Sequence, residues 1–133
     1  MSTQTIDNRI IAESKGRNAA LWTGQILLAA MFLMAGGSKL GGSEQMVQMF
    51  NAIGIGQWFR YLTGFIEFSS AILLLSPRLA GVGAALLSCT MIGAVLTHLF
   101  VIGGNPAMPI VLLVSAVLVA HGRKDRTLAL IGR

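Results

Sequence analysis

The chain has 133 residues, of which 54% are hydrophobic and only 11% are charged, and its formal net charge is +5. Because soluble domains carry about 25% charged residues, this composition excludes an ordinary soluble domain and indicates one small membrane domain. The basic residues gather at the ends of apolar runs and are not interleaved with aromatic residues, which argues against nucleic acid and for a lipid bilayer as partner.

The first part of the chain predicts one membrane span followed by a helix in a loop. Residues 1–18 form a polar tail, and the apolar run after them predicts a span at 19–38. The run is longer than the core of a secretory signal, about 7–15 residues, so we interpret it as a retained span. Gln25 lies inside it and is expected to hydrogen-bond to another helix. In the following loop, apolar residues of 46–53 recur at helical spacing, which predicts a short amphipathic helix on the membrane surface.

The rest of the chain predicts three further spans, at 58–75, 79–102 and 107–121, and a basic, solvated tail at 122–133. Aromatic residues mark the entry of the second span, a proline hairpin separates the second from the third, and a glycine-rich turn separates the third from the fourth. The third span begins with small residues that permit another helix to approach closely: Gly81, Ala84, Ala85 and Ser88. The predicted fold is therefore an all-α bundle of four transmembrane helices over residues 19–121.

The distribution of positive charge predicts the orientation of this bundle. Four spans place both termini on one side of the membrane. That side would carry eight basic residues and the opposite side two: Arg9, Lys15, Arg17, Arg78, Arg123, Lys124, Arg126 and Arg133 against Lys39 and Arg60. By the positive-inside rule, both termini are cytoplasmic and the amphipathic helix lies in the first outer loop.

Glu67 is the most informative residue of the sequence, because it lies within the second span. An ionisable group in hydrocarbon costs about 3 kcal/mol or more, so it normally faces a partner, a cavity or a ligand. The residues one turn away on its side of the helix are small or weakly polar: Thr63, Gly64, Ser70 and Ala71. Such a face packs against other helices, so Glu67 is expected to point into the bundle.

Two other helices bring polar groups to a similar depth. With a rise of about 1.5 Å per residue, Glu67 lies roughly 10 Å below the outer end of its span and His98 roughly 7 Å below the end of the third. Lys39 closes the first span on the same side. We therefore predict an outward-facing polar pocket for the head group of a quinone or a similar lipid-soluble ligand. Lys39, Arg60, Glu67 and His98 would bind it, and Glu67 and His98 would act as catalytic residues that exchange protons with it.

Each of these residues also has a structural interpretation. Lys39 and Arg60 could be interfacial anchors, and His98 could join two helices by a hydrogen bond. Glu67 is harder to explain in this way, because structure alone could use glutamine in place of a costly carboxylate. A pair with Lys39 or with His98 would keep that carboxylate charged.

Haem and metal sites are not expected. A bis-histidine haem site needs two histidines at similar depth, whereas His98 lies near the outer face and His121 at the cytoplasmic end. These two histidines and the single cysteine, Cys89, do not make a metal-ligand set.

The sequence resembles the DoxX family of small four-helix membrane proteins from Arg17 to His121. The resemblance is carried by four short motifs in order: Ala35-Gly-Gly-Ser-Lys39-Leu, Gly64-Phe-Ile-Glu67, Ser76-Pro-Arg-Leu-Ala-Gly81 and Thr97-His98. It implies a four-helix bundle in the bacterial inner (plasma) membrane. Known relatives include subunits of a thiosulfate–quinone oxidoreductase and proteins that assemble with superoxide dismutase and a sulfurtransferase. More distant eukaryotic relatives act in membrane-protein assembly and cargo export.

These observations leave hypotheses from different classes open. The first is a redox-linked membrane subunit that holds a quinone and works with a partner redox enzyme or as a homo-oligomer, rather than as an independent enzyme. The second is a non-catalytic assembly or scaffold protein whose polar cluster only joins the helices. A small-solute permease is less favoured, because the polar groups stop in the outer half and only Gln25 lies deeper.

Overall fold

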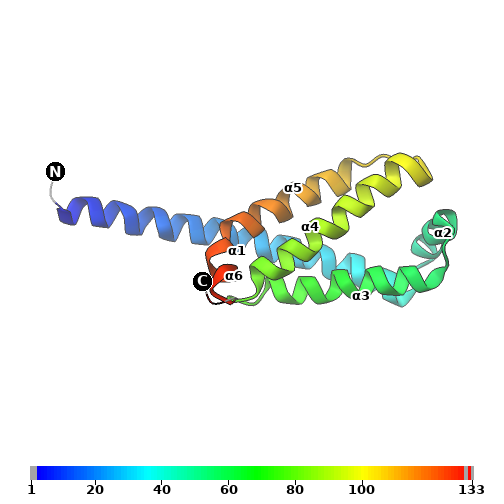
Figure 1. Cartoon of the computed structure of the whole chain (residues 1–133), viewed down its shortest axis with the longest axis horizontal. Coiled ribbons are helices and arrows are strands. Elements are labelled where there is room, and N and C mark those ends of the chain that lie inside the picture. Colours follow the sequence, from blue (N-terminus) through cyan, green and yellow to red (C-terminus); the bar gives the residue numbers. More distant parts are fainter. Residues whose placement is uncertain (1–2, 131, 133) are drawn as a thin grey trace.

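The computed structural model describes the backbone of residues 3–130 and 132, and the side chains of residues 3, 5, 15–130 and 132. Throughout this part of the chain, every secondary-structure element is a helix (Figure 1). The elements are α1 (Thr3–Gly41), α2 (Glu44–Ile53), α3 (Gln57–Leu74), α4 (Ala80–Thr97), the π-helical turn η1 (His98–Ile102), α5 (Ala107–Gly122) and α6 (Lys124–Leu130). The all-α prediction is confirmed. Of the basic residues used to predict the orientation, the side chain of Arg9 and the whole of Arg133 lie outside the described part.

Several of these helices are long and apolar enough to cross a membrane. Lys15–Gly41 of α1 and Ala80–Ile102 of α4 and η1 meet this criterion by length and composition. Helices α5 and α6 meet the criterion only together, and they are bent by 62° relative to each other. If the two form one broken span, they are a third candidate. Helix α3 has 18 residues but does not qualify, because Arg60 and Glu67 lower its mean hydropathy. The helices therefore support a multi-pass membrane protein, while the number of four spans stays a prediction.

The predicted helix of the first loop is present as α2. The Ser43 hydroxyl caps it by accepting a hydrogen bond from the backbone N–H of Met46 at 3.4 Å. Its apolar face turns inward, so that Phe50 is buried with its ring centroid 5.8 Å from that of Phe59. Gly54 ends the helix with φ of 88°, a left-handed conformation that favours glycine.

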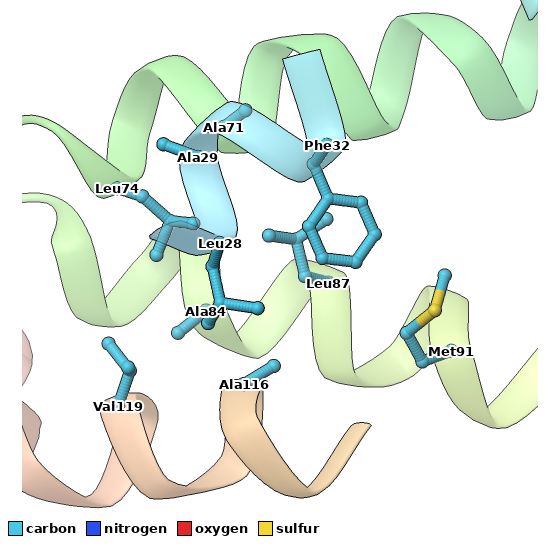
Figure 2. Packing of buried hydrophobic residues seen from close by; sticks show 10 residues of the cluster. All are labelled: Leu28, Ala29, Phe32, Ala71, Leu74, Ala84, Leu87, Met91, Ala116 and Val119. Atoms are coloured by element: carbon cyan, nitrogen blue, oxygen red, sulfur yellow. The ribbon is translucent and has the colours of Figure 1, made fainter. Parts of the chain in front are cut away.

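The helices pack as two pairs, α1 with α3 and α4 with α5, and α3 and α4 join the pairs. Figure 1 shows that the α4–α5 pair diverges from α3 toward the end where α2 lies. At the opposite end, the four helices close around an apolar core that Figure 2 shows from close by: Leu28, Ala29, Phe32, Ala71, Leu74, Ala84, Leu87, Met91, Ala116 and Val119. The core thus holds one end of the bundle together and leaves the other end open.

The small residues predicted to permit close packing of the third span are buried in part. Gly81, Ala84 and Ser88 are buried, whereas Ala85 is exposed. The buried arc of α4 extends instead to Gly83, where an added Cβ would lie 2.7 Å from the backbone oxygen of Ser70. With about 3.6 residues per turn, Ala85 falls just past the edge of this arc. The prediction of a packed face is right for that arc and wrong for Ala85.

Helices α1 and α3 approach each other closely at two glycines. A Cβ on Gly36 would lie 2.8 Å from the backbone nitrogen of Phe68 and 2.9 Å from the oxygen of Gly64. A Cβ on Gly64 would lie 2.8 Å from the Cβ of Lys39. Because glycine has no side chain, the two helix backbones can meet here, as they do in other pairs of membrane helices. Lys39 and Glu67 lie about one turn beyond these glycines, so the contact also sets the distance between their side chains.

We expect Gly36→Ala to destabilise the bundle, because its methyl group would collide with the backbone of α3. Overpacking of this kind costs about 1–3 kcal/mol. Gly37→Ala is the matched control, since nothing lies within 4 Å of a Cβ at that position. Thermal denaturation followed by circular dichroism in one detergent should give Gly36→Ala a lower melting temperature and Gly37→Ala an unchanged or higher one. Equal melting temperatures would contradict the close glycine contact.

Candidate functional site

A cavity of about 590 Å³ lies between the diverging helix pairs. This volume is within the range of about 300–1,000 Å³ that is typical of ligand sites. Its wall is mostly apolar and includes Phe32 and Met91, which also belong to the core, so the cavity lies directly against the core. The polar side chains of the wall are Lys39, Gln45, Thr63, Glu67, Thr90, Thr97, His98 and Asn105. Three of the four predicted site residues, Lys39, Glu67 and His98, therefore line one cavity.

Lys39 and Glu67 form an ion pair across the α1–α3 contact. The Nζ atom of Lys39 donates to Oε2 of Glu67 at 2.9 Å, and the two side chains are 13% and 3% exposed. Removing a carboxylate from water is costly, and a close counter-charge that also donates a hydrogen bond offsets this cost. The pair therefore explains how Glu67 can lie in an apolar bundle. It also presents an ammonium group to the cavity from the wall made by α1.

Arg60 lies outside the cavity wall and acts on the end of α1. Its Nη1 donates to the backbone oxygen of Lys39, and its Nε donates to Oε1 of Gln57 at 2.6 Å. The guanidinium carbon lies 4.2 Å from the centroid of the Tyr61 ring. The last carbonyl groups of a helix have no partner within the helix, and Arg60 satisfies one of them. Its contacts thus hold the backbone of Lys39, which is a different role from the predicted contact with a head group.

His98 enters the cavity wall from the other helix pair, at the point where α4 changes to the π-helical turn η1. Its Nδ1 lies 2.8 Å from the backbone oxygen of Ala94. A carbonyl oxygen can only accept, so Nδ1 carries a proton and donates here, while Nε2 takes no part in this bond. Single π-helical turns within α-helices are frequent at functional sites. Glu67 takes Lys39 as its partner, so His98 keeps this nitrogen for another contact.

Helix α2 covers the end of the cavity that lies away from the apolar core, which the sequence did not predict. Four of its apolar residues lie in the wall: Met46, Met49, Phe50 and Ile53. The spacing of apolar residues in 46–53 predicts the apolar face of this helix but places it on the membrane surface. Methionine side chains adapt to irregular shapes, so this cover suits ligands of more than one shape.

Among the described residues, no group of three or more His, Cys, Asp and Glu side chains is placed to hold a metal ion.

A second polar cluster lies at the closed end of the bundle. Gln25 is fully buried, and its Nε2 donates to the backbone oxygen of Leu74 at 2.8 Å, which confirms the predicted bond to another helix. Its Oε1 accepts a hydrogen bond from Nε of Arg123 at 2.6 Å. Arg123 is only 4% exposed, so the prediction that it belongs to a solvated tail is wrong. The bend between α5 and α6 turns it back onto α1, where Nη1 donates to Oδ1 of Asn18 at 2.9 Å.

Comparison with protein families gives a match to the DoxX-like family over residues 23–120. The chain belongs to the DoxX-like family. The match contains the wall residues of α1, α3, α4 and α5, including Lys39, Glu67 and His98. No curated protein and no solved structure matches the chain. For this DoxX-like protein, the family and the apolar helices together indicate a multi-pass membrane protein.

We expect Lys39→Met to destabilise this DoxX-like protein strongly, because it leaves the buried Glu67 carboxylate without its counter-charge. Breaking one partner of a buried ion pair costs about 3–5 kcal/mol. The double variant Lys39→Met/Glu67→Gln should recover much of the loss, since no charge is then left unpaired. Lys124→Met removes an exposed lysine and is the control. Melting temperatures in one detergent would test this, and equal values for the single and double variants would contradict the pair.

Proposed function

We propose that this DoxX-like protein is a redox-linked membrane subunit whose cavity binds a quinone or a similar lipid-soluble ligand. The observation that carries the proposal is the position of the Lys39–Glu67 pair and His98 on the wall of one mostly apolar cavity. A quinone has a polar ring with two carbonyl oxygens and an apolar tail. The polar wall groups suit the ring, and the apolar wall suits the tail.

The polar groups have distinct chemical roles in this proposal. The ammonium of Lys39 donates hydrogen bonds to a ring oxygen and binds it more strongly as negative charge develops there. Reduction of a quinone to a quinol takes up two electrons and two protons. The electrons come from a partner redox enzyme. Glu67 and His98 pass on the protons, one from each side of the cavity: each takes up a proton from solvent and gives it to a ring oxygen, since the paired Glu67 carboxylate holds none of its own.

The same proposal includes four spans with both termini in the cytoplasm of a bacterium and the cavity in the outer half of its inner membrane. Helix α3 has 18 residues, which corresponds to about 27 Å at about 1.5 Å per residue and approaches the hydrocarbon thickness of about 30 Å. Its polar residues Arg60 and Glu67 are buried against other helices, so they need not face lipid. The excess of basic residues at the two termini supports the orientation.

A scaffold function is the second candidate, and one observation favours it. Lys39 already satisfies the Glu67 carboxylate, and Arg60 satisfies the end of α1, so these contacts can fix α1 to α3 without a ligand. In that case the cavity would hold only lipid chains, and partner proteins would bind elsewhere. Direct measurement of quinone binding separates the two functions.

We expect Ala94→Leu to weaken binding of a short-chain benzoquinone by about 10-fold or more, equivalent to about 1.4 kcal/mol. The larger side chain would occupy space in the cavity, whose wall includes Ala94. Ala85→Leu is the matched control, because Ala85 is exposed on the same helix and lies outside that wall. Binding would be measured by titration calorimetry in lipid nanodiscs.

Glu67→Gln completes the experiment, because it keeps the shape of the side chain and removes its charge. It should also bind the quinone more weakly. All variants would first be compared by melting temperature, so that loss of structure is not taken for loss of binding. If Ala94→Leu and Glu67→Gln both bind as the unchanged protein does, or if that protein does not bind, the quinone proposal is wrong and the scaffold function is favoured.

A further inference from the structure

A second recess, of about 280 Å³, lies at the closed end of the bundle between the start of the first candidate span and α6. Its wall consists of Lys15, Arg17, Asn18, Leu21, Gly122, Arg123 and Arg126. Four of these residues are cationic, and none is acidic. The recess is separate from the quinone cavity and shares no wall residue with it. Among the side chains that the structure describes, it is therefore a concentration of positive charge without a counter-charge in its wall.

Arg123 forms part of the wall of this recess and is held in place there. It is 4% exposed, and two of its three nitrogens are held by the bonds to Gln25 and Asn18. The third nitrogen, Nη2, is buried and has no hydrogen-bond partner among the described atoms. A buried donor without a partner is unfavourable, so an acceptor that reached it would stabilise the protein.

The other cations of the recess add charge and leave donors available. Nη2 of Arg17 lies 3.5 Å from the backbone oxygen of Gly122, and Nη1 of Arg126 donates to the oxygen of Pro77 at 2.7 Å. Burial, and after it the charges of Arg126 and Arg17, lowers the pKa of the Arg123 guanidinium from its ordinary value. The positive charges of Arg17 and Arg126 therefore repel that of Arg123. A bound anion with several oxygens would offset this repulsion.

We propose that this recess binds a phosphate group, carried either by an anionic phospholipid or by free phosphate. Guanidinium groups bind phosphate oxygens through pairs of parallel hydrogen bonds, and several of them converge here. The position is that of a lipid head group, because the first candidate span begins at Lys15 and α5 ends at Gly122. Basic pockets between helices at this level of a membrane bind phosphorylated head groups.

The test measures stabilisation of the detergent-purified full chain by three probes. These are dioctanoyl phosphatidylglycerol, dioctanoyl phosphatidylcholine and inorganic phosphate, the last compared with potassium chloride at equal ionic strength. A ligand that binds the folded state raises its melting temperature. We expect phosphatidylglycerol to raise it and phosphatidylcholine not to. A rise with inorganic phosphate as well would identify the phosphate group itself as the ligand, whereas a rise with phosphatidylglycerol alone would identify the lipid as its source.

Variants connect the effect to the recess. Arg17→Gln/Arg126→Gln should weaken the binding of phosphatidylglycerol by about 10-fold or more, equivalent to about 1.4 kcal/mol. Arg78→Gln/Lys124→Gln removes the same charge at two exposed positions outside the recess and should leave binding unchanged. Lys15→Gln, at an exposed lining position, is the second variant if the first does not fold. No stabilisation by either anionic probe, or an equal loss in the recess and control variants, would overturn the proposal.

Discussion

The packing of α1 against α3 depends on the ion pair that allows the carboxylate of Glu67 to lie inside an apolar bundle. An isolated charge there would be strongly unfavourable, and the ion pair with Lys39 at 2.9 Å makes it tolerable. That distance requires α1 and α3 to touch, which Gly36 and Gly64 permit because neither has a side chain. Arg60 then fixes the end of α1 by donating to the backbone oxygen of Lys39. Backbone contact, ion pair and helix end thus form one unit, and each part holds the next in place.

The two ends of the bundle have different properties as a result. At one end, α1, α3, α4 and α5 close around the apolar core of Figure 2, and the bonds of Gln25 connect α1 to α3 and to Arg123. At the other end, α1 and α3 stay in contact while the α4–α5 pair diverges from them, so a cavity with polar groups on both sides remains. Membership of the DoxX-like family agrees with the helical membrane fold but constrains activity less, because function depends on the site and not on the fold. The quinone proposal therefore depends on this cavity.

Much of the fold follows from simple features of the sequence. Apolar runs, glycine and proline turns and the spacing around Phe50 predict the helices, and the similar depth of Lys39, Glu67 and His98 predicts that their side chains share one region. Other features require the packed structure. The segment that begins at Arg123 is highly charged, as solvated tails are. The Arg123 side chain is nevertheless buried, because the chain bends between α5 and α6. The sequence predicts Arg60 at the ligand, whereas its guanidinium bonds to the end of α1, because charge alone does not show whether a guanidinium faces a cavity or a helix end. The cover formed by α2 and the π-helical turn at His98 depend on how the helix pairs diverge, which local patterns do not encode.

The most direct test of the central claim is to identify the lipid-soluble molecules that remain in the cavity of the purified protein. The full chain would be extracted from bacterial membranes in mild detergent, washed, and analysed by quantitative mass spectrometry of its organic extract. The account predicts a quinone in an amount comparable to that of the protein, and a large loss of it when the cavity is filled at Ala94. Only bulk phospholipid in the extract, or a quinone content that the cavity substitution does not change, would contradict it.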